Sequence, residues 1–325
     1  MSNGDSTRSN MKSLKVGLAQ IAPVWLDKEQ TKEKIILYVQ KAGAEECDLV
    51  IFGEALLPGY PFWLGFTGGA AFNDDTQKAI HAHYLREAVD INGGDLSSIC
   101  DAARDNDIAV YLGTIELGTD RGGHSVYCAM VYIDKTGEIK SVHRKLMPTY
   151  EERLVWAIGD GHGLVVHDLE GFKVGGLNCW ENWMPLARTA LYAQGENIHV
   201  AIWPGSVRNT HDITPFIAKE SRSYSIGVSS LMRKEDIPPH LPHYELLMAS
   251  VPDVMADGGS CIAAPDGEWV VPPVEGKEAL ITGTLFHDMV LMERQNFDPV
   301  GHYSRPDVTR LVVNKQRQNI LTEEG

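Results

Sequence analysis

The sequence predicts an α/β protein, and three observations support this fold class. Strand-like apolar runs alternate with helical patterns from Leu14 onward. The chain of 325 residues is 43% hydrophobic, which is enough to bury a sizeable core. No linker divides the chain, although residues 237–242 form a local proline-rich loop. We therefore expect one domain over residues 13–313, flanked by a disordered tail at 1–12 and a flexible tail at 314–325, because both ends are polar and aperiodic.

The N-terminal half begins with a strand, a helix and a second strand. The helix, over residues 27–44, carries Ile35, Val39 and Ala42 on one face. A hairpin turn is expected at residues 135–138, which read Lys-Thr-Gly-Glu. The strands expected in this half span residues 14–22, 48–52, 108–117, 125–134 and 139–145, with a further helix at 97–104.

The C-terminal half continues the alternation. Pro185 suits the first position of a helix, and Gly195 suits the residue after its end, which predicts a helix over 185–194. A second helix is expected at 215–224 and a hairpin turn at 265–267. The strands expected in this half span residues 172–179, 198–203, 227–232 and 279–285.

Residues 55–73 carry no charge over 19 positions, which is long enough for a membrane span. Pro58 and Pro61, together with four glycines, would interrupt a helix repeatedly. We therefore expect an apolar loop that lines a pocket.

Composition excludes several classes of function. The net charge is −15, from 44 acidic and 29 basic residues, and no cluster of lysine and arginine stands out, so nucleic acid is not an expected partner. The five cysteines are scattered and odd in number, which predicts a reducing, cytoplasmic compartment. No charged-then-apolar leader is seen, so we expect no secretory signal.

The sequence also predicts neither a metal nor an organic cofactor. The histidine pairs His81/His83 and His240/His243 have the spacing of metal ligands, but no cysteine lies near them to complete a zinc site. Neither glycine-rich nucleotide-binding motif follows a predicted strand.

Cys179 is the candidate nucleophile. The apolar run at residues 172–177 predicts a buried strand that delivers this thiol to the start of a helix. Unpaired backbone N–H groups and the helix dipole at such a position favour the thiolate. The alternative is that Cys179 packs as a small hydrophobic residue.

Two other predicted strands also end on a polar residue, Glu54 and Lys145. A carboxylate at the mouth of an apolar strand loses solvent, which raises its pKa toward that of a general base. A fixed ammonium stabilises developing negative charge, and Glu152 is placed to orient it. The alternatives are a capping or ion-paired role for Glu54, an exposed lysine, and a solvated carboxylate at a helix start for Glu152. A papain-like site is not favoured, because none of the histidines lies in a partner motif.

These residues lie in three longer motifs: FGEALLPGYPFW around Glu54, HRKLMPTYEERLVWAIGDG around Lys145, and NCWENWMPLARTALYAQGE around Cys179. Together and in this order they resemble the nitrilase branch of the carbon–nitrogen hydrolase superfamily, and the resemblance continues through residues 202–205 and 298–308. It implies a four-layer αββα sandwich that assembles into homodimers or larger spiral homo-oligomers. It also implies a catalytic triad of Glu54, Lys145 and Cys179 with Glu152 as an additional glutamate.

The resemblance further implies hydrolysis of an organic nitrile to the carboxylic acid and ammonia, through a cysteine thioimidate and thioester and without a cofactor or metal. The backbone N–H of Trp180 is expected to contribute to charge stabilisation. An amidase or cyanide-hydrating activity, and a catalytically silent filament-forming scaffold, stay open as alternatives.

Aromatic residues flank the three motifs. Tyr60, Trp63, Trp180 and Trp183 are expected to contact the substrate, and Phe62 and Trp156 lie near them in the sequence. Together they predict an aromatic-lined pocket for aryl or arylaliphatic nitriles. The alternative for each is packing in the core.

Overall fold

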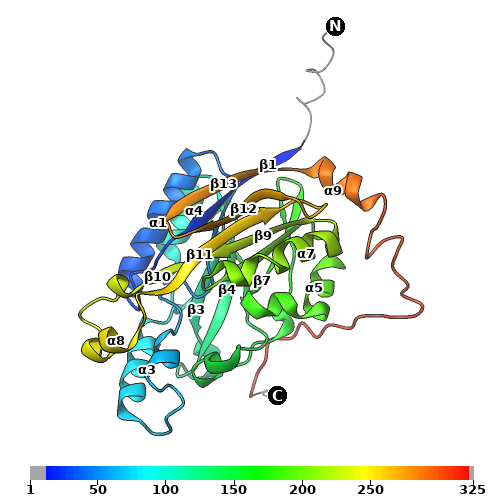
Figure 1. Cartoon of the computed structure of the whole chain (residues 1–325). Helices are drawn as coiled ribbons and strands as arrows, with labels where there is room; N and C mark the ends of the chain where they lie inside the picture. The colour runs from blue at the N-terminus through cyan, green and yellow to red at the C-terminus, as the bar shows by residue number, and fades with distance from the viewer. Residues whose placement is uncertain (1–11, 322–325) are drawn as a thin grey trace.

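Two β-sheets pack face to face at the centre of the structure, a computed structural model that describes residues 12–321 (Figure 1). The first sheet has the strand order β13-β1-β2-β3-β4-β5, with β1, β2 and β3 parallel to one another. Its strands span Ser13–Gln20 (β1), Leu49–Phe52 (β2), Ala109–Leu117 (β3), Val126–Ile133 (β4), Ile139–Arg144 (β5) and Ala279–Phe286 (β13).

The second sheet has the order β10-β11-β9-β8-β7-β6, and β12 also pairs with β11. Strands β7, β8 and β9 are parallel, as are β1, β2 and β3 of the first sheet. Its strands span His167–Leu169 (β6), Phe172–Asn178 (β7), Ile198–Trp203 (β8), Tyr224–Ser229 (β9), Leu231–Arg233 (β10), Val254–Ala263 (β11) and Trp269–Glu275 (β12).

Helices cover the outer face of each sheet. Figure 1 shows α1 and α4 on one side of the sandwich and α5 and α7 on the other. The helices span Lys28–Ala44 (α1), Trp63–Phe66 (α2), Asp75–Glu87 (α3), Ser97–Asp105 (α4), Pro185–Tyr192 (α5), Val207–Thr210 (α6), Ile213–Ser221 (α7), Tyr244–Ser250 (α8) and His287–Arg294 (α9). The layers therefore follow the order αββα, which confirms the expected fold class.

Alternating apolar side chains explain why the two sheets stack. On β1, Leu14, Val16 and Leu18 point into the core between the sheets, where they meet Val200 of β8 and Ile226 of β9. The residues that alternate with these along the strands of the first sheet point to its other face and pack against α1 and α4. Each sheet thus buries both faces, one against the other sheet and one against helices.

Two predicted elements differ from the structure by three residues at one end. The helix expected at 215–224 is α7, which ends at Ser221 because Arg222 has a left-handed φ of 52°. The strand expected at 227–232 is wrong as a single element, because the chain forms β9 and β10 with a break at Ser230. Residues 225–232 keep one register along β11, and the register shifts between Met232 and Arg233. Gly258 and Gly259 of β11 have positive φ opposite the break.

The segment 55–73 is largely irregular and contains only the short helix α2. Several of its residues line cavities, which confirms the predicted pocket-lining loop. Within residues 12–321, no helix combines the length and apolar character needed to cross a membrane. Helix α3, directly after this segment, has no counterpart in the sequence prediction.

The N-terminal tail expected at 1–12 lies almost entirely outside the described residues, as do residues 322–325. The part of the expected C-terminal tail that the structure describes makes specific contacts. Arg317 forms an ion pair with Asp160 at 3.0 Å, and the backbone N–H of Gln318 donates to the same carboxylate.

Candidate active site

Four polar side chains from both sheets meet in the interior. Glu54 follows β2, Lys145 follows β5, Glu152 lies on the 3-10 helix η3 (Tyr150–Leu154), and Cys179 follows β7 as the first residue of the 3-10 helix η5 (Cys179–Trp183). All four are at most 3% exposed. A carboxylate oxygen of Glu54, one of Glu152 and the sulfur of Cys179 lie within 4.8 Å of one another. The structure thus brings together the four residues that the sequence analysis selected for chemistry.

Lys145 joins the two carboxylates. Its Nζ lies 2.8 Å from Glu54 Oε1 and 2.6 Å from Glu152 Oε2. Burial lowers the pKa of Lys145, but the charges of Glu54 and Glu152 outweigh this and hold its pKa well above the usual value. The alternative of an ordinary exposed lysine is therefore wrong. The Lys145 ammonium is a buried positive charge beside the carboxylates of Glu54 and Glu152.

Glu54 has the environment of a general base. Burial raises its pKa to about 7, against the opposing effect of Lys145, in agreement with the expected loss of solvent at the strand mouth. Its Oε1 accepts from Lys145 and from the thiol of Cys128 at 3.5 Å. Its Oε2 is buried and has no hydrogen-bond partner among the described residues. One oxygen therefore fixes the carboxylate while the other stays free to accept a proton.

Glu152 has the opposite arrangement, because both of its oxygens are occupied. Oε2 accepts from Lys145 and from the backbone N–H of Thr149, in the capping box that begins η3. Oε1 accepts from the hydroxyl of Tyr60 at 2.8 Å. Glu152 does lie at a helix start, as the alternative assumed, but it is buried rather than solvated.

The expected thiolate at Cys179 is a point on which sequence and structure differ. Burial and the nearby Glu54 carboxylate raise the pKa of Cys179 well above its usual value, although Lys145 and the backbone N–H of Trp180 act in the opposite direction. Loss of solvent outweighs the favourable dipole at the start of η5, which is only five residues long. The free site therefore holds a protonated thiol next to a carboxylate that is able to take its proton.

Tyr60 connects the buried cluster to a cavity of about 370 Å³. The hydroxyl contacts Glu152, while the ring forms part of the cavity wall and packs edge-on against Trp156 at 5.5 Å. Burial raises the pKa of Tyr60 well above its usual value, so the hydroxyl stays a donor. The residues around this cavity are Tyr60, Phe62, Gly65, Phe66, Glu151, Pro204, Gly205, Ser206, Arg208, Asn209, Met255 and Ala256.

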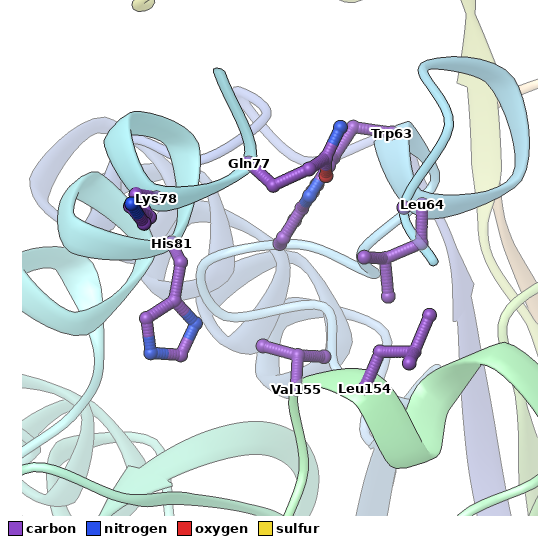
Figure 2. A pocket seen from close by; sticks show the side chains of 8 residues that line it. Trp63, Leu64, Gln77, Lys78, His81, Leu154 and Val155 are labelled. Carbon is purple, nitrogen blue, oxygen red and sulfur yellow. The ribbon is translucent and has the colours of Figure 1, made fainter. Parts of the chain in front are cut away.

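Trp63, also expected to contact substrate, lies in a different environment. It is buried and packs against Trp25 and Tyr84, with ring centroids 6.3 Å and 4.9 Å away. Figure 2 shows a smaller cavity at this place, between the segment of Trp63, helix α3 and η3. Its labelled walls include Gln77 and His81 on α3 and Leu154 and Val155 on and after η3. The structure does not place Trp63 among the four buried polar groups.

Trp180 and Trp183 lie on η5 and are 48% and 43% exposed. Their rings are 6.3 Å apart at the surface. Substrate contact by Trp63, Trp180 and Trp183 stays a prediction.

Three residues near the site were not selected from the sequence. Cys128 on β4 donates to Glu54, and nothing in its local pattern marks that contact. Asn178 and Glu181 form a capping box at the start of η5, for which an asparagine followed three residues later by a glutamate is a recognisable signal. Glu181 also accepts from the backbone N–H groups of Leu146 and Asn178, so one carboxylate ties the residue after Lys145 to the residue before Cys179.

Comparison with known proteins is consistent with this geometry. A family model described as "Carbon-nitrogen hydrolase" matches residues 15–290. Nitrilase 2 from an unknown prokaryotic organism is 35% identical over 313 residues, covering 95% of this chain and 96% of the relative. Nitrilase 2 of Arabidopsis thaliana is 32% identical, with 94% and 90% covered. A bifunctional nitrilase/nitrile hydratase of Oryza sativa subsp. japonica is 34% identical, with 95% and 86% covered.

Solved structures share the fold at lower sequence identity. A carbon–nitrogen hydrolase from Helicobacter pylori G27 has a TM-score of 0.68 at 17% identity, covering 92% of this chain and all of that chain. An amidase from Nesterenkonia sp. has a TM-score of 0.64 at 16% identity, covering 91% and 98%.

Proposed function

The chain belongs to the carbon–nitrogen hydrolase family, as a nitrilase-branch member that hydrolyses carbon–nitrogen bonds, and from this premise we propose that its substrate is an organic nitrile. The products are the carboxylic acid and ammonia. The observation that carries the proposal is the free, buried oxygen of Glu54 beside a protonated thiol and a doubly paired ammonium.

In the first half-reaction, Glu54 takes the proton of Cys179 as the sulfur attacks the nitrile carbon. Glu54 then passes this proton to the nitrile nitrogen, which leaves a covalent thioimidate on Cys179 and the Glu54 carboxylate ionised again. The Lys145 ammonium and the backbone N–H of Trp180 stabilise the negative charge that develops on nitrogen. Because Lys145 is held by two carboxylates, it enters the reaction in a fixed position.

In the second half-reaction, Glu54 accepts a proton from water that adds to the thioimidate carbon. The carbon–nitrogen bond breaks, ammonia leaves, and a thioester stays on Cys179. A second water breaks the carbon–sulfur bond and releases the carboxylic acid with the thiol restored. If the first tetrahedral intermediate instead loses the thiol, the product is the amide.

The cavity beside Tyr60 supports arylaliphatic or aryl nitriles as substrates. Its wall includes three aromatic side chains, Tyr60, Phe62 and Phe66, together with Met255. The hydroxyl of Tyr60 contacts Glu152, so a ring held in this cavity lies next to the buried cluster.

The test is a panel of aryl, arylaliphatic and aliphatic nitriles, each paired with its own amide, assayed for ammonia and for organic product. We expect ammonia and acid from nitriles, slower turnover of the matching amides, and a substrate-derived mass increase on the Cys179 peptide after acid quench. Faster turnover of the amides would establish the amidase alternative, and no turnover of any compound would support the silent scaffold.

Activity is expected to fall at acidic pH because of Glu54. The carboxylate must be ionised to accept the thiol proton, and its pKa is about 7, so kcat/KM should decrease toward tenfold per pH unit below that value. A pH–rate profile with a good nitrile, between pH 5 and 9, checks this. An acid limb near pH 4.5, the value of an ordinary glutamate, would contradict the assignment of Glu54 as base.

We also propose that the protein forms homodimers or larger spiral homo-oligomers. An apolar patch supports this proposal, and it consists of Trp180, Trp183, Met184, Leu186 and Phe216. Four of these residues lie on η5 or at the start of α5, and Phe216 lies on α7. Arg188 of α5 links the two helices, since its guanidinium lies 5.5 Å from the ring of Phe216. Exposed apolar patches on this scale are typical of interaction surfaces.

Substituting Leu186→Asp should therefore reduce the oligomer size, because Leu186 is the most exposed of these five residues, at 68%. Light scattering after size-exclusion chromatography measures the effect. Leu37→Asp is the matched control, since Leu37 is 47% exposed on α1, on the opposite side of the sandwich. Equal masses for both variants would contradict an interface at this patch.

A further inference from the structure

A buried polar chain lies behind the candidate nucleophile and has no part in the steps above. It runs from Cys179 through Asn182 and His199 to Glu196. Asn182 lies on η5, His199 on β8, and Glu196 just before β8. The last three side chains are fully buried in the layer between the second sheet and its helices. Buried polar groups are costly unless they are satisfied, so the contacts of this chain are informative.

The hydrogen bonds of Asn182 fix the orientation of its amide. Its Nδ2 donates to the carbonyl of Cys179 at 2.8 Å and to the carbonyl of Leu177 at 3.2 Å. The side-chain oxygen must therefore face the other way, where it lies 2.7 Å from Nε2 of His199. An amide oxygen only accepts, so Nε2 of His199 carries the hydrogen.

Glu196 in turn fixes the histidine ring. Nδ1 of His199 lies 3.1 Å and 3.2 Å from the two carboxylate oxygens of Glu196. This contact holds one proton, on either partner, and burial raises the pKa of Glu196 against the opposing effect of His199. In both protonation states the ring has a partner at each nitrogen and cannot turn without losing both.

The chain ends at a residue whose backbone conformation is strained. Cys179 has a φ of 49°, in the left-handed region that residues with a side chain rarely occupy. This turn aims the sulfur toward Glu54 and Lys145 and brings the backbone N–H of Trp180 to the thiol. The carbonyl that Asn182 holds belongs to the same residue, so releasing it allows the turn to relax.

We propose that His199 is a positioning residue for the nucleophile: by donating to Asn182, it holds the backbone turn that aims the sulfur of Cys179. The proposal rests on the proposed function for its kinetic consequence, but not for its structural one. Arg188 contributes from the other side, because its Nη1 donates to the backbone carbonyl of Asn182 at 2.7 Å.

Two substitutions at one position separate positioning from stability. In His199→Gln, the side-chain amide nitrogen lies near the place of Nε2 and keeps the donor to Asn182, while the contact with Glu196 is lost. In His199→Asn, the shorter amide lies near the place of Nδ1 and keeps a partner for Glu196, while the donor to Asn182 is lost. The first variant should thus lose mainly thermal stability, and the second mainly activity.

Three measurements on the full chain distinguish the two variants. Steady-state kinetics with a nitrile should show a kcat about 10- to 100-fold lower for His199→Asn with KM little changed, and a kcat within about threefold of the native value for His199→Gln. The rate of iodoacetamide addition to Cys179, followed by peptide mass spectrometry, should fall for His199→Asn and not for His199→Gln. Thermal melting should place His199→Gln at or below His199→Asn.

The outcomes distinguish this proposal from the proposed function. If the native protein hydrolyses nitriles and His199→Asn keeps its kcat, or both variants lose kcat in proportion to their melting temperature, then His199 has only a structural role and the inference is overturned. If the native protein hydrolyses no nitrile but the two variants differ in the alkylation of Cys179 as stated, the positioning role holds and the proposed function fails.

Discussion

Substituting Cys179→Ala should lower kcat for nitrile hydrolysis by at least about 10³-fold, the scale seen when the nucleophile of a covalent mechanism is removed. The reason is specific to this cavity. Glu54, Lys145 and Glu152 stay in place, but among the cysteines of residues 12–321 only Cys179 is found grouped within 4.8 Å of both carboxylates. Among the described residues, the nearest candidate is Cys128, whose thiol instead donates to Glu54 and has a pKa raised well above its usual value by burial. Ammonia release with a responsive nitrile measures the effect.

Cys47→Ala is the matched control for this experiment. Cys47 is also a free, buried cysteine, but it packs between α1 and the first sheet, away from the candidate site. It should keep nearly native kcat, with at most a modest loss of stability from the smaller side chain. Equal ammonia release from the native protein and Cys179→Ala would end the covalent cysteine mechanism.

The second large effect is expected at Lys145, where activity and stability should fall together. Lys145→Met removes the only cation within 4 Å of either carboxylate in the described chain, and leaves Glu54 and Glu152 buried side by side. Breaking a buried ion pair from one side costs about 3–5 kcal/mol, because the remaining charge has no counter-ion. Catalysis should fall by about 10²- to 10³-fold, since the developing charge on the substrate nitrogen loses its stabilising ammonium.

A double variant separates these two losses. Adding Glu152→Gln to Lys145→Met removes one of the unpaired charges and should recover part of the free energy of unfolding, measured by denaturant titration. It should recover no activity, because the ammonium is still absent. Recovery of kcat along with stability would show that Lys145 acts only in folding.

The sequence predicted the positions of the candidate site residues better than it predicted their protonation states. Glu54 and Cys179 each follow a largely apolar strand, and Lys145 follows a strand of mixed composition after a hairpin turn, so local patterns are enough to place all three at strand ends. The prediction was less accurate elsewhere. It gave one strand in place of β9 and β10, and it did not include helix α3. The break at Ser230 lies opposite two glycines of β11, which come about thirty residues later in the chain and are therefore outside any local window.

The aromatic residues also show a difference between what the sequence predicts and what only the structure decides. Tyr60 and Trp63 are three positions apart in one motif, and the sequence offered no way to tell them apart. In the structure, Tyr60 contacts Glu152 and a cavity, whereas Trp63 packs among Trp25 and Tyr84. The difference arises because segments distant in the sequence pack on the two sides of this loop, with Glu152 next to Tyr60 and with Trp25 and Tyr84 next to Trp63.

By itself, then, the sequence determined which residues are candidates for the chemistry and at which strand ends they lie, because strand periodicity and helix signals are local properties of the chain. Only the tertiary structure decided how these groups are charged and held. The pKa of Glu54 near 7, the protonated thiol of Cys179 and the chain from Glu196 to the Cys179 carbonyl all require two sheets and a helix layer to exclude water from the same small volume. Solvent exclusion and the distances between charges from distant segments are set by packing, and no local pattern encodes them.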